Sequence, residues 1–88
     1  MLDVVQAVMI DSMGMRRKAK IVRNASQAWV VLCADVVNEH AKNEWLWQLW
    51  PAPDSQQFSL WFDSKGEMLE KLCELFGTEE IAKIAGKL

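Results

Sequence analysis

The residue types that most often carry out catalysis are scarce in this chain, which has one histidine, two cysteines and no tyrosine. His40 lies in a polar segment beside Glu39, with Asp35 nearby. An imidazole next to a carboxylate can act as a general base, but no spaced Ser/His/Asp set and no glycine-rich phosphate loop accompanies it. We therefore interpret His40 as a solvent-exposed loop residue, predict no catalytic residues, and do not expect an enzyme.

The two cysteines, Cys33 and Cys73, both lie in apolar runs, where a thiol usually behaves as a small hydrophobic side chain. Their distance from each other and from the histidine does not fit a metal site, so we expect neither a metal nor a cofactor, and no small-molecule substrate. Two isolated thiols favour a reducing compartment. The apolar segment 1–10 has no basic leader region and is too short to cross a bilayer. We therefore expect a cytoplasmic protein without a membrane segment.

Five tryptophans in 88 residues are the most prominent feature of the composition. A buried indole needs a partner for its N–H, and a chain this short buries only part of its surface. Some indoles should therefore stay accessible, and accessible tryptophans are favoured in protein interfaces. Alternation along the strands should place Trp45 and Trp47 on one face of a sheet, and Trp50 and Trp61 on the other. We expect Trp50 and Trp61, with Trp29 nearby, to form a protein-binding surface.

Positive charge is concentrated in one run: Arg16, Arg17, Lys18, Lys20 and Arg23. Residues 1–30 carry five Lys/Arg and two Asp/Glu, a charge of +3, and residues 31–88 carry five Lys/Arg and ten Asp/Glu, a charge of −5. A basic strand with tryptophans nearby could bind phosphates and stack bases, or bind an acidic protein. The acidic remainder of the chain repels nucleic acid. We therefore interpret the run as a charged edge strand, with nucleic-acid binding as the alternative.

Hydrophobic spacing predicts the elements that position these residues. The sequence predicts a helix over 2–13, strands over 16–23, 28–37, 44–50 and 57–62, a helix over 64–76 and a short final helix from residue 78. Two of these segments remain ambiguous, because the first would also fit a strand and residues 39–50 would also fit a helix. Within 57–62, alternation should turn Phe58, Leu60 and Phe62 inward.

The C-terminal helix has the clearest boundaries. Ser64 and Glu67 have the spacing of a capping box, Gly77 should end the helix, and Thr78 should cap the final one. The predicted fold is thus a single small α+β domain over residues 1–88. It would have a three- to four-stranded antiparallel sheet, the C-terminal helix packed on one face, a short final helix and an N-terminal helix.

These observations favour a binding protein over an enzyme. We expect a small protein-interaction module, an inhibitor or adaptor, that binds a protein partner through the aromatic sheet face, and a homodimer built on that face is a variant. Small acidic domains without enzyme motifs are often made by phages and mobile elements to block a host system. The alternative function is nucleic-acid binding through the basic run.

Overall fold

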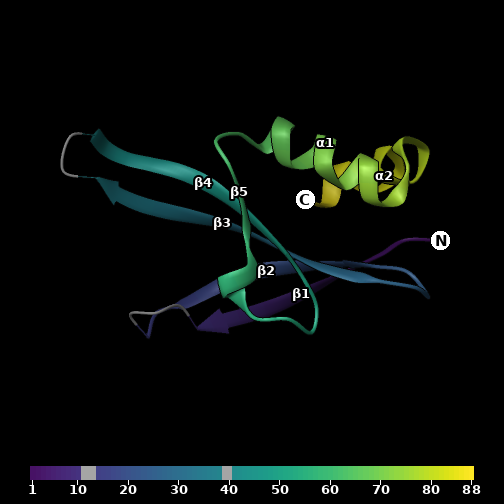
Figure 1. The fold of residues 1–88 in the computed structure, drawn as a ribbon, viewed down its shortest axis with the longest axis horizontal. Coiled ribbons are helices and arrows are strands. Elements are labelled where there is room, and N and C mark those ends of the chain that lie inside the picture. Colours follow the sequence, from purple (N-terminus) through teal and green to yellow (C-terminus); the bar gives the residue numbers. More distant parts are fainter. Residues whose placement is uncertain (11–13, 39–40) are drawn as a thin grey trace.

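The computed structural model of the protein describes residues 1–10, 14–38 and 41–88, and only the backbone of residues 35–38 and 41–44. Its elements are β1 (Asp3–Ile10), β2 (Arg16–Arg23), β3 (Ala28–Asn38), β4 (Ala41–Pro51), the 3-10 helix η1 (Gln56–Phe58), β5 (Leu60–Phe62), α1 (Lys65–Phe76), α2 (Thr78–Ile84) and the 3-10 helix η2 (Ala85–Lys87). The strands form one antiparallel sheet whose spatial order is the chain order. Both helices lie together on one side of that sheet (Figure 1), so the fold is α+β.

The start of the chain is a strand, so the predicted N-terminal helix is wrong and the sheet has five strands rather than three or four. β1 pairs with β2 along its whole length, from Asp3 opposite Arg23 to Ile10 opposite Arg16. Its valines and isoleucine favour extended backbone, and each of its residues lies opposite a residue of β2. Because β1 pairs on its outer side, β2 is an interior strand of the sheet. The basic run is therefore not an edge strand, and β1 takes the edge position.

The two hairpins diverge at the end of the molecule away from the helices (Figure 1). β2 pairs with β3 only over residues 20–23 and 28–31, whereas β3 and β4 pair along nearly their whole length. The strand prediction for residues 44–50 is confirmed by β4, and the helical alternative is excluded. β3 lies at the centre of the sheet, as its apolar faces predicted.

Hydrophobic side chains are buried on both faces of this sheet. On the helix side, the buried cluster consists of Leu2, Val22, Val31, Leu49, Met68, Leu72, Ile81 and Ile84. On the opposite side, a smaller cluster consists of Ala19, Val30, Leu32 and Trp50, with Met9, Ile21 and Ala52 packed against it. The face away from the helices therefore has a core of its own, and the expectation that it stays open is wrong.

The segment between β4 and β5 turns back across this second face (Figure 1). The Ala52 amide donates to the Ala28 carbonyl oxygen at 2.9 Å. Further along, the side-chain nitrogen of Gln56 donates to the side-chain oxygen of Gln48 at 2.9 Å. This bond gives a partner to the oxygen of a glutamine that is only 3% exposed. These contacts hold the returning segment against β3 and β4, and Ala52 of this segment packs against the smaller cluster.

The C-terminal helix begins as predicted. The Ser64 hydroxyl accepts from the Glu67 amide at 3.2 Å, and the Glu67 carboxylate accepts in return from the Asp63 amide at 3.2 Å. Gly77 ends α1 with a φ of 97°, a conformation that favours glycine. Thr78 does not cap α2, because Gly77 occupies that position and no side chain bonds the free amides.

The last strand is shorter than predicted. Only Leu60–Phe62 pair with β4, and Phe58 lies in η1 with 59% of its surface exposed. Leu60 is also 41% exposed. The inward orientation predicted for Phe58 is therefore wrong, because η1 interrupts the alternation. Leu60 lies on the helix side with Leu49, as the alternation predicted, but it stays partly exposed because β5 has no strand neighbour on its outer side within the described residues.

Candidate functional site

The five tryptophans have very different surroundings. Trp50 is 1% exposed and Trp29 and Trp47 are partly buried, whereas Trp45 is 58% exposed and Trp61 is 52% exposed. The expectation that this fold cannot hide all its indoles is confirmed by Trp45 and Trp61. The expected exposure of Trp50 is wrong, since its ring is enclosed within the protomer and is not available to a partner in this conformation.

Trp29 is also held within the fold. Its indole N–H donates to the Gln27 side-chain oxygen at 3.1 Å, and the Gln27 side-chain nitrogen donates to the Leu75 carbonyl oxygen at 2.9 Å. This chain of bonds links β3 to α1 through a satisfied indole. Trp29 lies on the helix side of the sheet, against the larger cluster, and not beside Trp61.

Three exposed apolar side chains lie close together in sequence at the β5 edge of the sheet. They are Phe58, Leu60 and Trp61, exposed by 59%, 41% and 52%, and we call them the edge patch. Leu60 pairs with Leu49, and Trp61 pairs with Gln48, so the two point to opposite sides of the sheet. Aromatic and aliphatic side chains thus lie on both sides of a strand that pairs, within the described residues, only with β4.

The five basic residues of β2 divide between the two faces of the sheet. The register places three of them on the helix side with Val22, namely Arg16, Lys18 and Lys20. We call these three the basic stripe. Arg17 and Arg23 lie on the other side. There, Arg23 forms an ion pair with Asp3 at 3.0 Å. The structure therefore divides the predicted set of five, and only three of its members form one surface.

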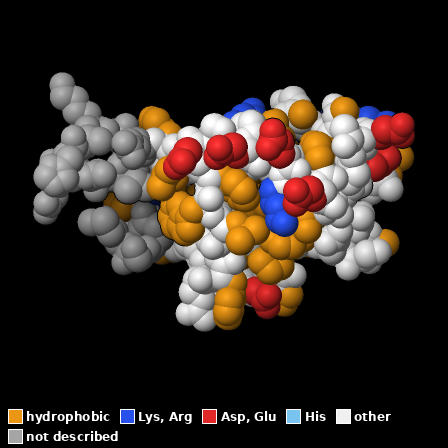
Figure 2. Space-filling view, turned by 45° about the horizontal axis from the view of Figure 1, so that its top comes forward, with side chains coloured by type: hydrophobic (Ala, Val, Ile, Leu, Met, Phe, Trp, Pro, Cys, Tyr) orange, Lys and Arg blue, Asp and Glu red, His pale blue; other side chains and the backbone are white. Residues whose placement is uncertain are grey.

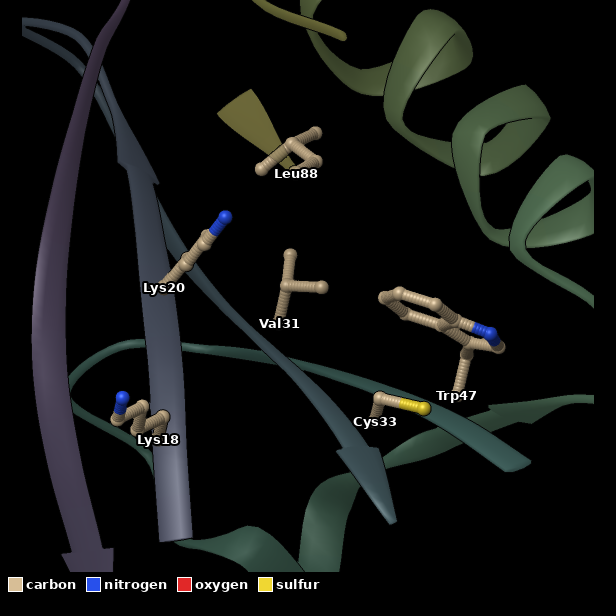
Figure 3. Close-up of a pocket in the computed structure, with 6 residues that line it drawn as sticks. All are labelled: Lys18, Lys20, Val31, Cys33, Trp47 and Leu88. Carbon is tan, nitrogen blue, oxygen red and sulfur yellow. The ribbon is translucent and has the colours of Figure 1, made fainter. Parts of the chain in front are cut away.

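A hollow of about 130 Å³ lies beside the basic stripe on the helix side of the sheet. Its lining is Lys18, Lys20, Val31, Cys33, Trp47 and Leu88 (Figure 3). The Lys20 ammonium points toward the C-terminal residues and donates to the Lys87 carbonyl oxygen. The Lys65 ammonium lies 5.9 Å from the centroid of the Trp47 ring, and it also donates to the Leu88 carbonyl oxygen at 2.6 Å. Two lysines of the basic run and Trp47 therefore line one hollow.

The size and chemistry of the hollow limit what it could hold. Sites for cofactors or metabolites usually measure about 300–1,000 Å³, well above the 130 Å³ found here. Cys33 contributes a thiol to the lining, and burial raises the pKa of this thiol, which keeps it in the less reactive protonated form. The hollow could accept a single side chain or a phosphate group, but it offers no catalytic set.

Acidic residues gather on the helices, opposite in sign to the basic stripe. The exposed carboxylates of this layer are Glu67, Glu70, Glu74 and Glu79. Figure 2 shows acidic side chains in a row over the helical side of the molecule, with hydrophobic side chains gathered beside them. Two of the helical lysines are engaged with these acids, since Lys71 pairs with Glu74 at 3.1 Å and Lys83 with Glu80 at 3.4 Å.

Other predicted features lie outside the site or outside the described residues. His40 falls among the residues that the structure does not describe. Among those it does describe, no three of His, Cys, Asp and Glu come together as a metal site would need, and no helix is long and apolar enough to cross a membrane. Both cysteines are free.

No protein-family model, no curated protein and no solved structure matches this chain.

Proposed function

We propose that this chain is a cytoplasmic protein-binding module, an inhibitor or adaptor, which docks through the edge patch of Phe58, Leu60 and Trp61. The observation that carries the proposal is the exposure of these three side chains, by 59%, 41% and 52%, at an edge of the sheet. Clustered exposed apolar side chains on a small domain typically mark a contact surface. Aromatic residues of this kind contribute most of the affinity in many interfaces.

The backbone beside the edge patch supports a particular binding mode. β5 pairs with β4 on one side, and its outer side has no strand partner within the described residues. An extended segment of a partner could add to this edge through main-chain hydrogen bonds, and its side chains would then contact Leu60 on one face and Trp61 on the other. The patch would supply specificity, and the backbone would supply the register.

The charges around the edge patch suggest the chemistry of the partner segment. Asp54 and Asp63 flank it in the sequence and are both exposed, and no lysine or arginine lies between them. An acidic rim around an apolar centre complements a partner with apolar residues flanked by basic ones, because such charges steer association. We expect the bound segment to be extended, apolar at its centre and basic at its ends.

Affinity capture from host lysate with two matched variants tests this proposal. Phe58→Ser combined with Trp61→Thr removes the two aromatic side chains of the edge patch, and Trp45→Ala removes an indole of similar exposure on the opposite side of the sheet. We expect a protein that is captured by the wild type and by Trp45→Ala, and whose affinity falls at least about tenfold in the double variant. A partner retained equally by all three proteins would contradict the proposal.

A second candidate function is favoured by one observation, that Lys18, Lys20 and Trp47 line the same hollow. Single-stranded nucleic acids bind surfaces that combine cations with stacking aromatic rings, and Trp45 extends the aromatic row on the helix side of β4. The acidic helices on that side oppose a phosphate backbone. This function therefore ranks below protein binding.

Fluorescence anisotropy with a labelled single-stranded oligonucleotide separates the two functions. Nucleic-acid binding would give an affinity that falls steeply as salt rises and that drops in a Lys18→Gln, Lys20→Gln variant. Protein binding through the edge patch predicts no anisotropy change at low salt, and the lysine variant should then capture the protein partner as well as the wild type does.

A further inference from the structure

The opposite edge of the sheet is unprotected. β1 is an eight-residue strand that pairs, within the described residues, only with β2. Its only charged residue is Asp3, and it contains no lysine, proline or glycine. Val8 is 56% exposed and Ile10 is 60% exposed, and both lie in the half of the strand that the helices do not cover. Stable proteins usually block such an edge with charge, proline, a bulge or short length.

The two edges of this sheet therefore differ in the protection they have. β5 has three residues, and short length is itself a common defence of an edge strand. β1 is long, β-branched and apolar, and its outer backbone groups lie ready for a second ladder. The length and composition of β1 therefore need a structural explanation of their own.

We propose that β1 is the dimer interface of this protein, where it pairs antiparallel with β1 of a second copy around a two-fold axis at Gln6. In a continuous antiparallel sheet, residues opposite each other must lie on the same face. Odd and even positions of β1 lie on different faces. A two-fold axis must therefore pass through a residue and not between two residues, and Gln6 is at the centre of the segment 2–10.

This register makes the two halves of β1 complementary. Leu2 is 8% exposed and Val4 packs against the helix-side cluster, so the helices cover that half. The register places Val8 of one copy opposite Val4 of the other, and Ile10 opposite Leu2. The uncovered half of each strand then lies beside the half that the other copy's helices cover, and the exposed apolar side chains gain apolar neighbours. An unrelated strand would show this match only by chance, which is why the second copy is the favoured occupant.

The charges are compatible with the same register. Asp3 comes opposite Met9 of the second copy, which itself pairs with Arg17 in its own protomer. No two like charges face each other directly, and the two Gln6 amides meet at the axis, where each can donate to the other. After pairing, the outermost strands of the ten-stranded sheet, within the described residues, are the two β5 strands. The edge patch of each protomer remains free, so the dimer and the proposed binding of a partner are independent.

Sedimentation equilibrium over a range of protein concentrations tests the proposal. We expect a mass that rises from 10.1 kDa toward twice that value. Val8→Glu should shift the population to the monomer, since the carboxylate would lie opposite Val4 of the second copy but next to Lys18 in its own protomer, where it is tolerated. Phe58→Glu introduces the same charge at the opposite edge of the sheet, at a residue about as exposed as Val8, and should leave the dimer unchanged.

Cysteine cross-linking checks the register in a background where Cys33 and Cys73 are serine. Gln6→Cys should form an intermolecular disulfide readily. Ile10→Cys should not, because the two introduced thiols would lie about 27 Å apart along the paired strands. A protein that is monomeric at every concentration would overturn the proposal. So would a dimer that survives Val8→Glu, that is lost in Phe58→Glu, or that cross-links through residue 10 and not residue 6.

Discussion

Trp50 and Trp61 face the same side of the sheet from neighbouring strands, yet one is 1% exposed and the other 52% exposed. Trp50 is opposite Val30 and belongs to the smaller cluster, which the segment after β4 covers. Trp61 lies where that segment has already returned to the sheet as β5. The difference shows that the alternation of a strand determines the side of the sheet, whereas the course of the chain between strands determines burial.

Among the substitutions that test this difference, Trp50→Ala should have the largest effect on stability. Loss of a fully buried tryptophan should reduce the free energy of unfolding by about 3–5 kcal/mol, because burial is lost and a cavity remains. The total for a chain of this length is only about 4–13 kcal/mol. Urea denaturation followed by circular dichroism measures the change. Trp45→Ala, on an indole that is 58% exposed, is the matched control and should cost far less.

Trp50→Phe keeps this prediction testable if the alanine variant does not fold. The smaller ring should cause an intermediate loss of stability. Equal stability of the Trp50→Ala and Trp45→Ala proteins would mean that the second cluster does not form in solution.

Gln48→Ala examines the residue that separates the two tryptophans on this face. Gln48 is 3% exposed and accepts a hydrogen bond from the Gln56 side-chain amide at 2.9 Å, so the change leaves the partly buried Gln56 amide without this partner. We expect the free energy of unfolding to fall by about 1–3 kcal/mol. Gln57→Ala, at an exposed position in η1, is the control. No difference between the two variants would show that the Gln48–Gln56 bond does not hold the returning segment.

Trp61→Thr should have the smallest effect on stability. The side chain is half exposed, and threonine keeps the preference for extended backbone, so we expect a change below about 1 kcal/mol. The same denaturation experiment measures it. A loss as large as that of Trp50→Ala would mean that Trp61 is buried in solution, and the edge patch would then not exist as described.

The sequence was sufficient for the parts of the fold that local patterns control. Residues 44–50 alternate, and β4 follows that alternation with Trp47 and Trp50 on opposite sides. The capping residues Ser64 and Glu67 located the start of α1 correctly, because a cap is made by residues three positions apart.

The sequence-based predictions that were wrong concern features that depend on residues far apart in the sequence. Val4 and Val8 suit either a helix or a strand by spacing alone, and the choice is decided by pairing with β2. The burial of Trp50 depends on Ala19, from β2, and on Ala52, from the segment after β4. The hollow likewise joins Lys18 and Trp47 from strands that are not neighbours in the sheet. No local pattern contains these contacts.

Agreement between strand order and chain order has a kinetic consequence. Each sheet pairing joins segments adjacent along the polypeptide, so every ladder closes only a short loop, and such contacts form fast. The helix-side cluster is different, because it unites Leu2 with Ile84 from opposite ends of the sequence. We therefore expect the cluster around Trp50 to assemble first, with docking of the helices as the late step of folding.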